Sequence, residues 1–327
     1  MDRDSVGWKG YWIAAPTPFT ETGALDESAL RSVLRLYREQ GVHGVLVNGT
    51  TGEWFSQTEA ERRRVAEIGV EELKGQIPVV IGCTTFTPWQ TIALGLHARD
   101  IGADGMLSTP PPYAAPMPRE IVAFFSAISD SVDLPIMVYN WAHGVAVEII
   151  WETAVELAKI PRVVAIKDST VNRIQALATL EKVGDQLRVF GSFIDRLGLS
   201  VLRDLGGDGN IDGGGLGARF AVAFYEAFWR DDLTAAQYAA NRYVALMTRL
   251  IRPDWSGVLG SPQSQLKACM NMLSQPGGHV RPPLLPIDDP RHLETLRQIL
   301  DETGLFADAA RPALVHQRDS IYRSRVG

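Results

Sequence analysis

Lys167 is the first candidate for a catalytic residue in this chain, because of the residues around it. It ends an apolar, β-branched run at 163–166, and the polar residues Asp168 and Ser169 follow it. Such a run predicts a buried parallel strand, and burial lowers the pKa of a lysine because it disfavours the charged ammonium. A free amine can then attack a carbonyl carbon and form a Schiff base. The segment alone also fits an incidental lysine that reaches solvent along its apolar stem or pairs with Asp168.

Tyr139 ends another apolar run, at 135–138, and is a second candidate. A Schiff base acts as an electron sink, so a carbon–carbon bond next to the former carbonyl can be made or broken, which requires proton transfers. A phenol both donates and accepts a proton, and Tyr139 is therefore a candidate proton shuttle. The alternative is a tyrosine at the rim that bonds to a backbone carbonyl.

The segment Gly49-Thr50-Thr51-Gly52-Glu53 is a candidate carboxylate-binding loop. Glycines on both sides of two hydroxyl residues allow backbone N–H groups and side-chain oxygens to point at one anion. Glycine and threonine are also ordinary turn residues. Glu53 is either catalytic or a structural carboxylate that accepts backbone N–H groups.

The elements that must position these residues follow a regular alternation. Apolar runs alternate with segments of helical periodicity, and Thr58 with Glu61 forms a capping box. Eight strand–helix units predict a (β/α)8 TIM barrel, because a doubly wound sheet usually stops at about five or six strands. We expect strands at 11–15, 44–48, 78–82, 104–108, 135–139, 163–167, 188–191 and 209–211, and helices at 26–40, 58–75, 88–101, 117–131, 148–158, 171–182, 195–205 and 217–229.

The chain changes character after residue 232. Three helical stripes replace the alternation, and a Pro/Gly-rich loop at 276–286 lies among them. We therefore expect a barrel domain at 8–232, a C-terminal three-helix appendage at 233–306, and a tail at 307–327 with weak periodicity.

The barrel prediction turns positions in the sequence into a predicted site. TIM-barrel enzymes place the active site at the C-terminal ends of the strands, so the segments that follow the strands converge on one mouth, with Lys167 as their one lysine. The glycine-rich stretch 206–217 is more readily explained as room for a ligand or backbone than as a phosphate site. No arginine or lysine lies between Asp204 and Ala218, and Asp212 would repel a phosphate.

Composition narrows the function classes. A formal net charge of −6 with 21% charged residues gives no basic surface for nucleic acid or acidic membranes. Two cysteines and six scattered histidines show neither a disulfide framework nor metal-ligand spacing, so we expect no metal. No apolar run approaches the roughly 20 residues of a membrane span. Residues 1–4 lack the features of a signal peptide, and we expect a cytoplasmic protein.

From about Gly10 to Phe306, the chain resembles the N-acetylneuraminate lyase / dihydrodipicolinate synthase family of class I, pyruvate-type lysine aldolases. The order and spacing of several motifs carry the resemblance. They are Pro16-Thr17-Pro18-Phe19, Gly49-Thr50-Thr51-Gly52-Glu53, Thr109-Pro110 leading to Tyr113, Tyr139-Asn140, Ile166-Lys167-Asp168, Gly209-Asn210-Ile211 and Leu285-Pro286.

The resemblance implies roles for the matching residues. Lys167 would form the Schiff base with pyruvate or another 2-oxo acid, and Tyr139 would transfer protons. Thr50 and Thr51, preceded by Gly49, would bind the carboxylate. The covalent lysine imine would serve in place of a cofactor.

The resemblance also implies a shared site. Thr50 would link Tyr139 to Tyr113, which in this family is lent across a subunit interface of a homotetramer built as a dimer of dimers. Ile211 would contact the bound keto acid through its backbone.

The chain departs from the family at the acceptor side. Synthases of dihydrodipicolinate share a Tyr-Asn-x-Pro-x-Arg segment whose arginine holds the acceptor's carboxylate. Here Ala142 replaces the proline and Gly144 stands where the arginine would be. Loss of a bidentate carboxylate clamp argues against synthase activity.

Aromatic residues surround the expected acceptor site instead. Trp54 and Phe55 follow the glycine–threonine loop, and Trp141 and His143 follow the fifth strand, with Ser192 after the seventh. Such rings suit an apolar or aromatic aldehyde, although Trp54 and Phe55 also fit a role as core residues.

Three functions follow from these observations. The leading hypothesis is a Schiff-base lyase that cleaves or forms a bond between pyruvate and an aldehyde, including a bulky or aromatic one. The second is a dehydratase or deaminase that acts on a hydroxy or deoxy 2-oxo acid through the same imine. The third is a non-catalytic protein that binds 2-oxo acids.

Overall fold

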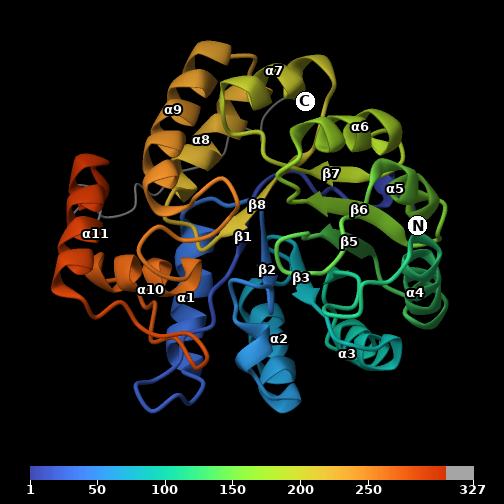
Figure 1. Ribbon diagram of the computed structural model, residues 1–327, viewed down its shortest axis with the longest axis horizontal. Coiled ribbons are helices and arrows are strands. Elements are labelled where there is room, and N and C mark those ends of the chain that lie inside the picture. The colour runs from blue at the N-terminus through green and yellow to red at the C-terminus, as the bar shows by residue number, and fades with distance from the viewer. Residues whose placement is uncertain (307–327) are drawn as a thin grey trace, which may run out of the picture.

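A closed barrel of eight parallel strands forms the centre of the protein. The computed structural model describes residues 1–306, and the strands pair in chain order, with β8 next to β1 (Figure 1). This confirms the predicted (β/α)8 TIM barrel. The strands are β1 Gly10–Ala14, β2 Gly44–Val47, β3 Val79–Gly82, β4 Gly105–Ser108, β5 Ile136–Asn140, β6 Val163–Asp168, β7 Arg188–Phe190 and β8 Gly209–Gly213.

Helices surround this barrel, and three more follow it. Figure 1 shows α10 and α11 extending to one side of the barrel. The predicted division between 8–232 and 233–306 stays a prediction, and the predicted tail at 307–327 lies outside the described residues. The helices are α1 Glu27–Glu39, α2 Glu59–Leu73, α3 Pro88–Asp100, α4 Pro118–Ser131, α5 Trp151–Ala158, α6 Arg173–Val183, α7 Arg196–Asp204, α8 Ala218–Trp229, α9 Leu233–Leu250, α10 Pro262–Met272 and α11 Pro290–Glu302, with short 3-10 turns at Arg3–Ser5 and Trp54–Ser56.

Local signals explain where helices begin. The Thr58 side chain accepts from the Glu61 N–H and the Glu61 carboxylate accepts from the Thr58 N–H, which confirms the capping box of α2. The helix expected from residue 148 begins later, at Trp151. Asn140 Oδ1 accepts from the Ile149 N–H at 2.9 Å, and Asn140 Nδ2 donates to the Ile149 carbonyl at 3.1 Å, and these contacts engage the backbone of Ile149 just before the helix.

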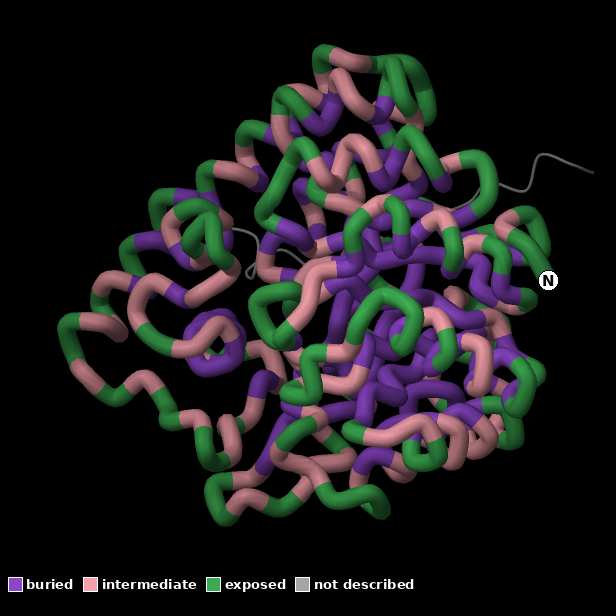
Figure 2. The backbone as a smooth tube through the Cα atoms, turned by 45° about the vertical axis from the view of Figure 1, so that its right-hand side comes forward, coloured by how far each residue is buried: buried purple, intermediate pink, exposed green. Residues whose placement is uncertain are grey.

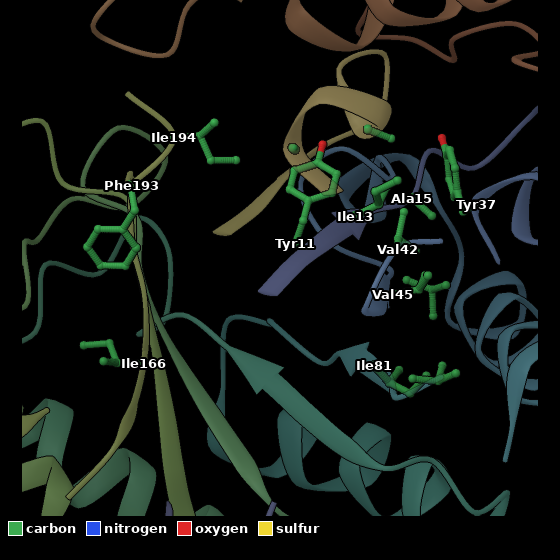
Figure 3. Packing of buried hydrophobic residues seen from close by; sticks show 14 of the residues in the cluster. Tyr11, Ile13, Ala15, Tyr37, Val42, Val45, Ile81, Ile166, Phe193 and Ile194 are labelled. Carbon is green, nitrogen blue, oxygen red and sulfur yellow. The ribbon is translucent and has the colours of Figure 1, made fainter. Parts of the chain in front are cut away.

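Two apolar clusters hold the barrel. Side chains alternate along a strand, so Trp12 and Leu46 belong to the interior cluster, whereas Ile13 and Val45 belong to the cluster that includes the helices. Figure 3 shows part of the outer cluster, with residues of β1 and β2 on one side and Ile166, Phe193 and Ile194 on the other. Figure 2 shows the buried strands at the centre and exposed segments on the periphery. Within residues 1–306, no helix combines the length and apolar character that crossing a bilayer requires.

An irregularity between β5 and β6 decides which residues face the mouth. Ile136 pairs with Val163 but Met137 pairs with Ala165, so the strands change register at this point. Beyond the irregularity, Tyr139 pairs with Lys167. Side chains at paired positions of neighbouring strands point to the same face, so these two residues lie side by side.

Candidate active site

A cavity of about 1290 Å³ lies at the carboxyl ends of the strands. It brings together nearly all of the predicted site residues. Tyr113 is the predicted residue that does not line it. Those that do are Gly49, Thr50, Thr51, Trp54, Tyr139, Trp141, His143, Gly144, Lys167, Ser192 and Ile211.

Lys167 carries a buried amine. The residue is 7% exposed, and its Nζ lies 4.2 Å from the centroid of the Tyr139 ring. Burial lowers the pKa of Lys167 to about 8, while the Asp212 carboxylate acts in the opposite direction. About a tenth of the amine is therefore uncharged at pH 7.

Asp168 has hydrogen-bond partners other than this amine. Its Oδ1 accepts from Asn140 Nδ2 at 2.9 Å and from the Thr170 N–H at 3.1 Å. Burial raises the pKa of the Asp168 carboxyl to about 6. The alternative in which Lys167 pairs with Asp168 is therefore wrong.

Tyr139 places a phenol beside the amine. Burial raises the pKa of Tyr139, and the side chains of Ser169 and Thr50, which reach its hydroxyl, act in the opposite direction. The ring stacks on Trp141, with centroids 5.7 Å apart and an interplanar angle of 22°. The phenol therefore stays protonated around neutral pH in a fixed orientation, which suits a group that passes protons.

Residues of β8 and α10 contact the glycine–threonine loop. Glu53 has a φ of 56°, in the left-handed region. A Cβ at Gly213 of β8 would meet Thr51 Oγ1 at 2.9 Å, so the glycine makes room for that side chain. Gln263 of α10 donates from Nε2 to the Thr50 carbonyl oxygen at 3.0 Å. The C-terminal helices thus help to hold the loop.

A buried ion pair fixes the end of the same loop. Lys267 Nζ lies 2.6 Å from Glu53 Oε1, and both side chains are at most 2% exposed. Lys267 also donates to the carbonyl oxygens of Thr17 and His279, each at 2.7 Å. The Arg281 N–H donates to Glu53 Oε2 at 3.1 Å. These contacts support the structural role for Glu53.

Trp141 fills the space beside Gly144. A Cβ on Gly144 would lie 2.1 Å from Trp141 Nε1, so no other side chain fits at this position while the indole stays there. His143 is exposed and packs edge-on against Trp141, with centroids 5.5 Å apart. The first side-chain atom of an arginine at position 144 would therefore overlap an aromatic ring.

Other predicted residues lie at the edge of the cavity. Trp54 is half-buried, with the Arg62 guanidinium 5.1 Å from its ring centroid, and Phe55 is 41% exposed. Neither residue belongs to the buried core, so the core interpretation is wrong for both. Tyr113 is 93% exposed, with a φ of 75°, and its predicted role stays a prediction.

Sequence reasoning assigned no role in the site to three residues around the mouth. Ser169 reaches the hydroxyl of Tyr139. Its position two residues after Lys167 is the sequence feature that could have marked it as a site residue. Asp212 accepts a hydrogen bond from the Tyr243 hydroxyl of α9, and burial raises its pKa. Trp255 donates from Nε1 to the Ser169 carbonyl at 2.9 Å, across 86 positions of sequence, and no local pattern marked it.

No group of three or more His, Cys, Asp or Glu residues within 1–306 is arranged to hold a metal ion. The fold and the cavity together define a (β/α)8 barrel whose candidate functional groups lie at the carboxyl ends of β2, β5 and β6.

Comparison with known proteins gives the family. The model of the dihydrodipicolinate synthetase family matches residues 8–303, and the chain belongs to this family, whose members are lyases and synthases. It is 32% identical over 290 residues to an uncharacterized DapA-like lyase of Rhizobium meliloti, covering 86% of this chain and 92% of that protein. It is 31% identical over 282 residues to the 4-hydroxy-tetrahydrodipicolinate synthase of Parvibaculum lavamentivorans, covering 85% and 93%. The crystal structure of Thermotoga maritima dihydrodipicolinate synthase is similar, with a TM-score of 0.81, 28% identity and coverage of 91% and 99%.

The coupling between Asp212 and Lys167 predicts a pH effect. The carboxylate raises the pKa of Lys167, so Asp212→Asn lowers that pKa and shifts the rising limb of amine reactivity to lower pH. We expect about a two- to threefold faster reaction with pyruvate and cyanoborohydride at pH 7, measured as the rate of Lys167 modification. Asp185→Asn, which removes an exposed carboxylate elsewhere, should leave the profile unchanged. Coincident profiles for the wild type and Asp212→Asn would contradict the coupling.

The buried ion pair predicts a stability effect. Lys267→Met leaves the Glu53 carboxylate buried without its counter-charge and should lower the free energy of unfolding by about 3–5 kcal/mol in urea denaturation. The double variant Lys267→Met/Glu53→Gln should regain part of the lost free energy of unfolding. The exposed pair of Lys182 with Glu181 supplies the control, because Lys182→Met should change stability by less than about 1 kcal/mol. Strictly additive losses in the double variant would show that the two side chains do not interact.

Proposed function

We propose that the protein is a Schiff-base-forming lyase that makes or breaks a carbon–carbon bond between pyruvate and an aldehyde. The single observation that carries the proposal is the buried Lys167 amine beside the Tyr139 ring, at 4.2 Å, inside a cavity that also holds Thr50 and Thr51. Family membership supports the class of reaction.

The chemistry begins at the amine. Neutral Lys167 attacks the C2 carbonyl of the 2-oxo acid to give a carbinolamine, which gains a proton and loses water to form the iminium. The carboxylate of the 2-oxo acid lies against the Thr50–Thr51 turn, where hydroxyl and backbone N–H groups can donate to it. The positive iminium then withdraws electrons from the neighbouring carbon.

Tyr139 handles the protons of the bond-breaking step. Tyr139 first gives its phenol proton to the hydroxyl that leaves the carbinolamine as water. In the cleavage direction, the resulting phenolate accepts the proton of the C4 hydroxyl, the C3–C4 electron pair moves toward the iminium, and the aldehyde leaves. The enamine that remains takes this proton from Tyr139 at C3. Water then adds to the iminium and loses a proton to Tyr139, which releases pyruvate and restores the Lys167 amine. Condensation follows the same steps in reverse.

The acceptor side of the site favours an aldehyde without a carboxylate, the group that the arginine of the synthases would bind. Gly144 carries no side chain, and the Trp141 indole occupies the adjacent space. Its stacking on Tyr139 brings an apolar surface next to the reacting carbon. An uncharged aldehyde, including a bulky or aromatic one, suits this wall better than one with a carboxylate.

We also propose that the site is completed by a second copy of the chain in a homotetramer. Large apolar side chains are exposed on the segments after β3 and β4, two strands that pair in the barrel. Phe86 is 61% exposed, Trp89 68%, Met117 62% and Tyr113 93%. Covering them at an interface would remove apolar surface from water and would carry Tyr113 toward a neighbouring site.

A reductive trapping experiment tests the Schiff base. Incubation with pyruvate and borohydride should leave a covalent adduct on Lys167, located by peptide mass spectrometry. Lys167→Ala should prevent the adduct and lower kcat for aldehyde-dependent turnover by about a thousandfold or more. Lys159→Ala, at an exposed lysine, should behave as the wild type.

An unmodified Lys167 in the wild type would refute the lyase mechanism. If the adduct forms but turnover of the substrate releases water or ammonia and no pyruvate, the reaction is a dehydration or deamination through the same imine.

Mixing two variants tests the shared site. We expect Tyr113→Phe to assemble as the wild type in light scattering and to lose about tenfold to a hundredfold in kcat, because a proton relay is interrupted. Lys167→Ala is inactive by itself. Mixed oligomers of the two contain some sites with both native residues, so dissociation and reassembly of the mixture should restore part of the activity. A monomeric wild type, or a mixture no more active than its components, would rule out the shared site.

A further inference from the structure

A tight hairpin between α9 and α10 carries Trp255 to the mouth of the cavity. Ile251 and Gly257 form an antiparallel bridge. The Arg252 N–H donates to the Ser256 carbonyl at 2.8 Å, and the Trp255 N–H donates to the Arg252 carbonyl at 2.9 Å. The Arg252 guanidinium also donates to the Gly257 carbonyl at 2.7 Å. The hairpin is therefore cross-linked by its own hydrogen bonds and presents Trp255 on a defined turn.

The backbone of Trp255 is unusual for its residue type. Its φ is 66°, in the left-handed region, where bulky side chains are rare and which persists only when surrounding contacts maintain it. One such contact is the hydrogen bond from Trp255 Nε1 to the Ser169 carbonyl, at 2.9 Å. Ser169 in turn reaches the hydroxyl of Tyr139. The indole is thus tied to the loop that follows Lys167.

Trp255 and Trp141 form an aromatic corner over the site. Their ring centroids are 6.4 Å apart with an interplanar angle of 53°. Trp141 continues this surface onto the Tyr139 ring, and all three residues line the same cavity as Lys167. Two rings at this angle offer both a face and an edge. A third aromatic ring packs favourably against both.

We infer that Trp255, supplied by the C-terminal helical region, is a specificity-determining residue that selects acceptors carrying a planar aromatic group. The inference rests on the proposed lyase function and names the substrate class that this function acts on. The hairpin completes a wall that the segment after β5 supplies only in part through Trp141.

The charges around the cavity agree with an uncharged aromatic group. The arginines among the described lining residues are Arg173 and Arg252. Arg173 is paired with Asp195 at 2.6 Å, and the Arg252 guanidinium is engaged by carbonyl oxygens of its own hairpin. Lys167 is reserved for the imine. Among the described lining residues, each guanidinium thus already has a carboxylate or carbonyl partner, so none is left free to bind a carboxylate on the acceptor.

The experiment compares two aldehydes in three variants. Benzaldehyde and propionaldehyde serve as acceptors with pyruvate, and each kcat/KM is divided by the same variant's rate of pyruvate methyl-proton exchange in deuterium oxide, which reports the imine step alone. Trp255→Ala removes the ring. Trp255→Phe keeps a ring but loses the N–H that bonds to Ser169. Trp229→Phe, at an indole that packs on His43 outside the cavity, is the control.

We expect the wild type to prefer benzaldehyde, and Trp255→Ala to reduce the normalised value for benzaldehyde about fivefold to tenfold more than that for propionaldehyde. Trp255→Phe should retain most of the preference and Trp229→Phe all of it. Equal losses for both aldehydes, or no preference in the wild type, would overturn the inference. Absence of proton exchange in the wild type would instead refute the proposed function itself.

Discussion

The enclosure of the Lys167 amine in the apolar interior of the barrel is the constraint on which the rest of the site depends. Closing eight parallel strands brings alternate side chains inward, and the apolar interior includes the large residues Trp12 and Phe190, the second of which pairs with Lys167 across β6 and β7. Water cannot solvate an ammonium fully there, so the pKa of Lys167 falls to about 8. The same enclosure keeps Tyr139 protonated. The fold therefore sets the protonation states of both groups before any substrate binds.

A second buried lysine shows why geometry must accompany burial. Lys267 is also enclosed, and its pKa is also lowered. Its ammonium, however, meets the Glu53 carboxylate and the carbonyl oxygens of Thr17 and His279, which match its three N–H donors. Both amines also lie near an aromatic ring, Phe19 for Lys267 and Tyr139 for Lys167, so the ion pair and the carbonyl oxygens are what distinguish Lys267. Two lysines of similar burial thus take different roles: one cross-links the chain and the other keeps an amine available to a ligand.

The barrel could be predicted from hydrophobic periodicity and from the spacing of apolar runs, because each strand and helix leaves a local pattern in the sequence. They also placed Lys167 and Tyr139 at one mouth, since the carboxyl ends of parallel strands must meet. The irregularity that pairs Tyr139 with Lys167 leaves no such pattern, and neither does the contact of Gln263 with Thr50, which are 213 positions apart. Contacts of that kind depend on how the C-terminal helices dock, which is a tertiary outcome.

The aromatic corner gives a physical sense to the departure at Gly144. A residue with a side chain there would collide with the Trp141 indole, and Trp141 is in turn positioned between Tyr139 and Trp255. Introducing an arginine at 144 alone would therefore displace Trp141 and disturb its stacking on Tyr139. Gly144 therefore goes together with the aromatic wall formed by Trp141 and Trp255. This wall takes the place of the positively charged arginine that the synthases have at the same position. Acceptor specificity in this chain would then depend on a segment outside the barrel strands.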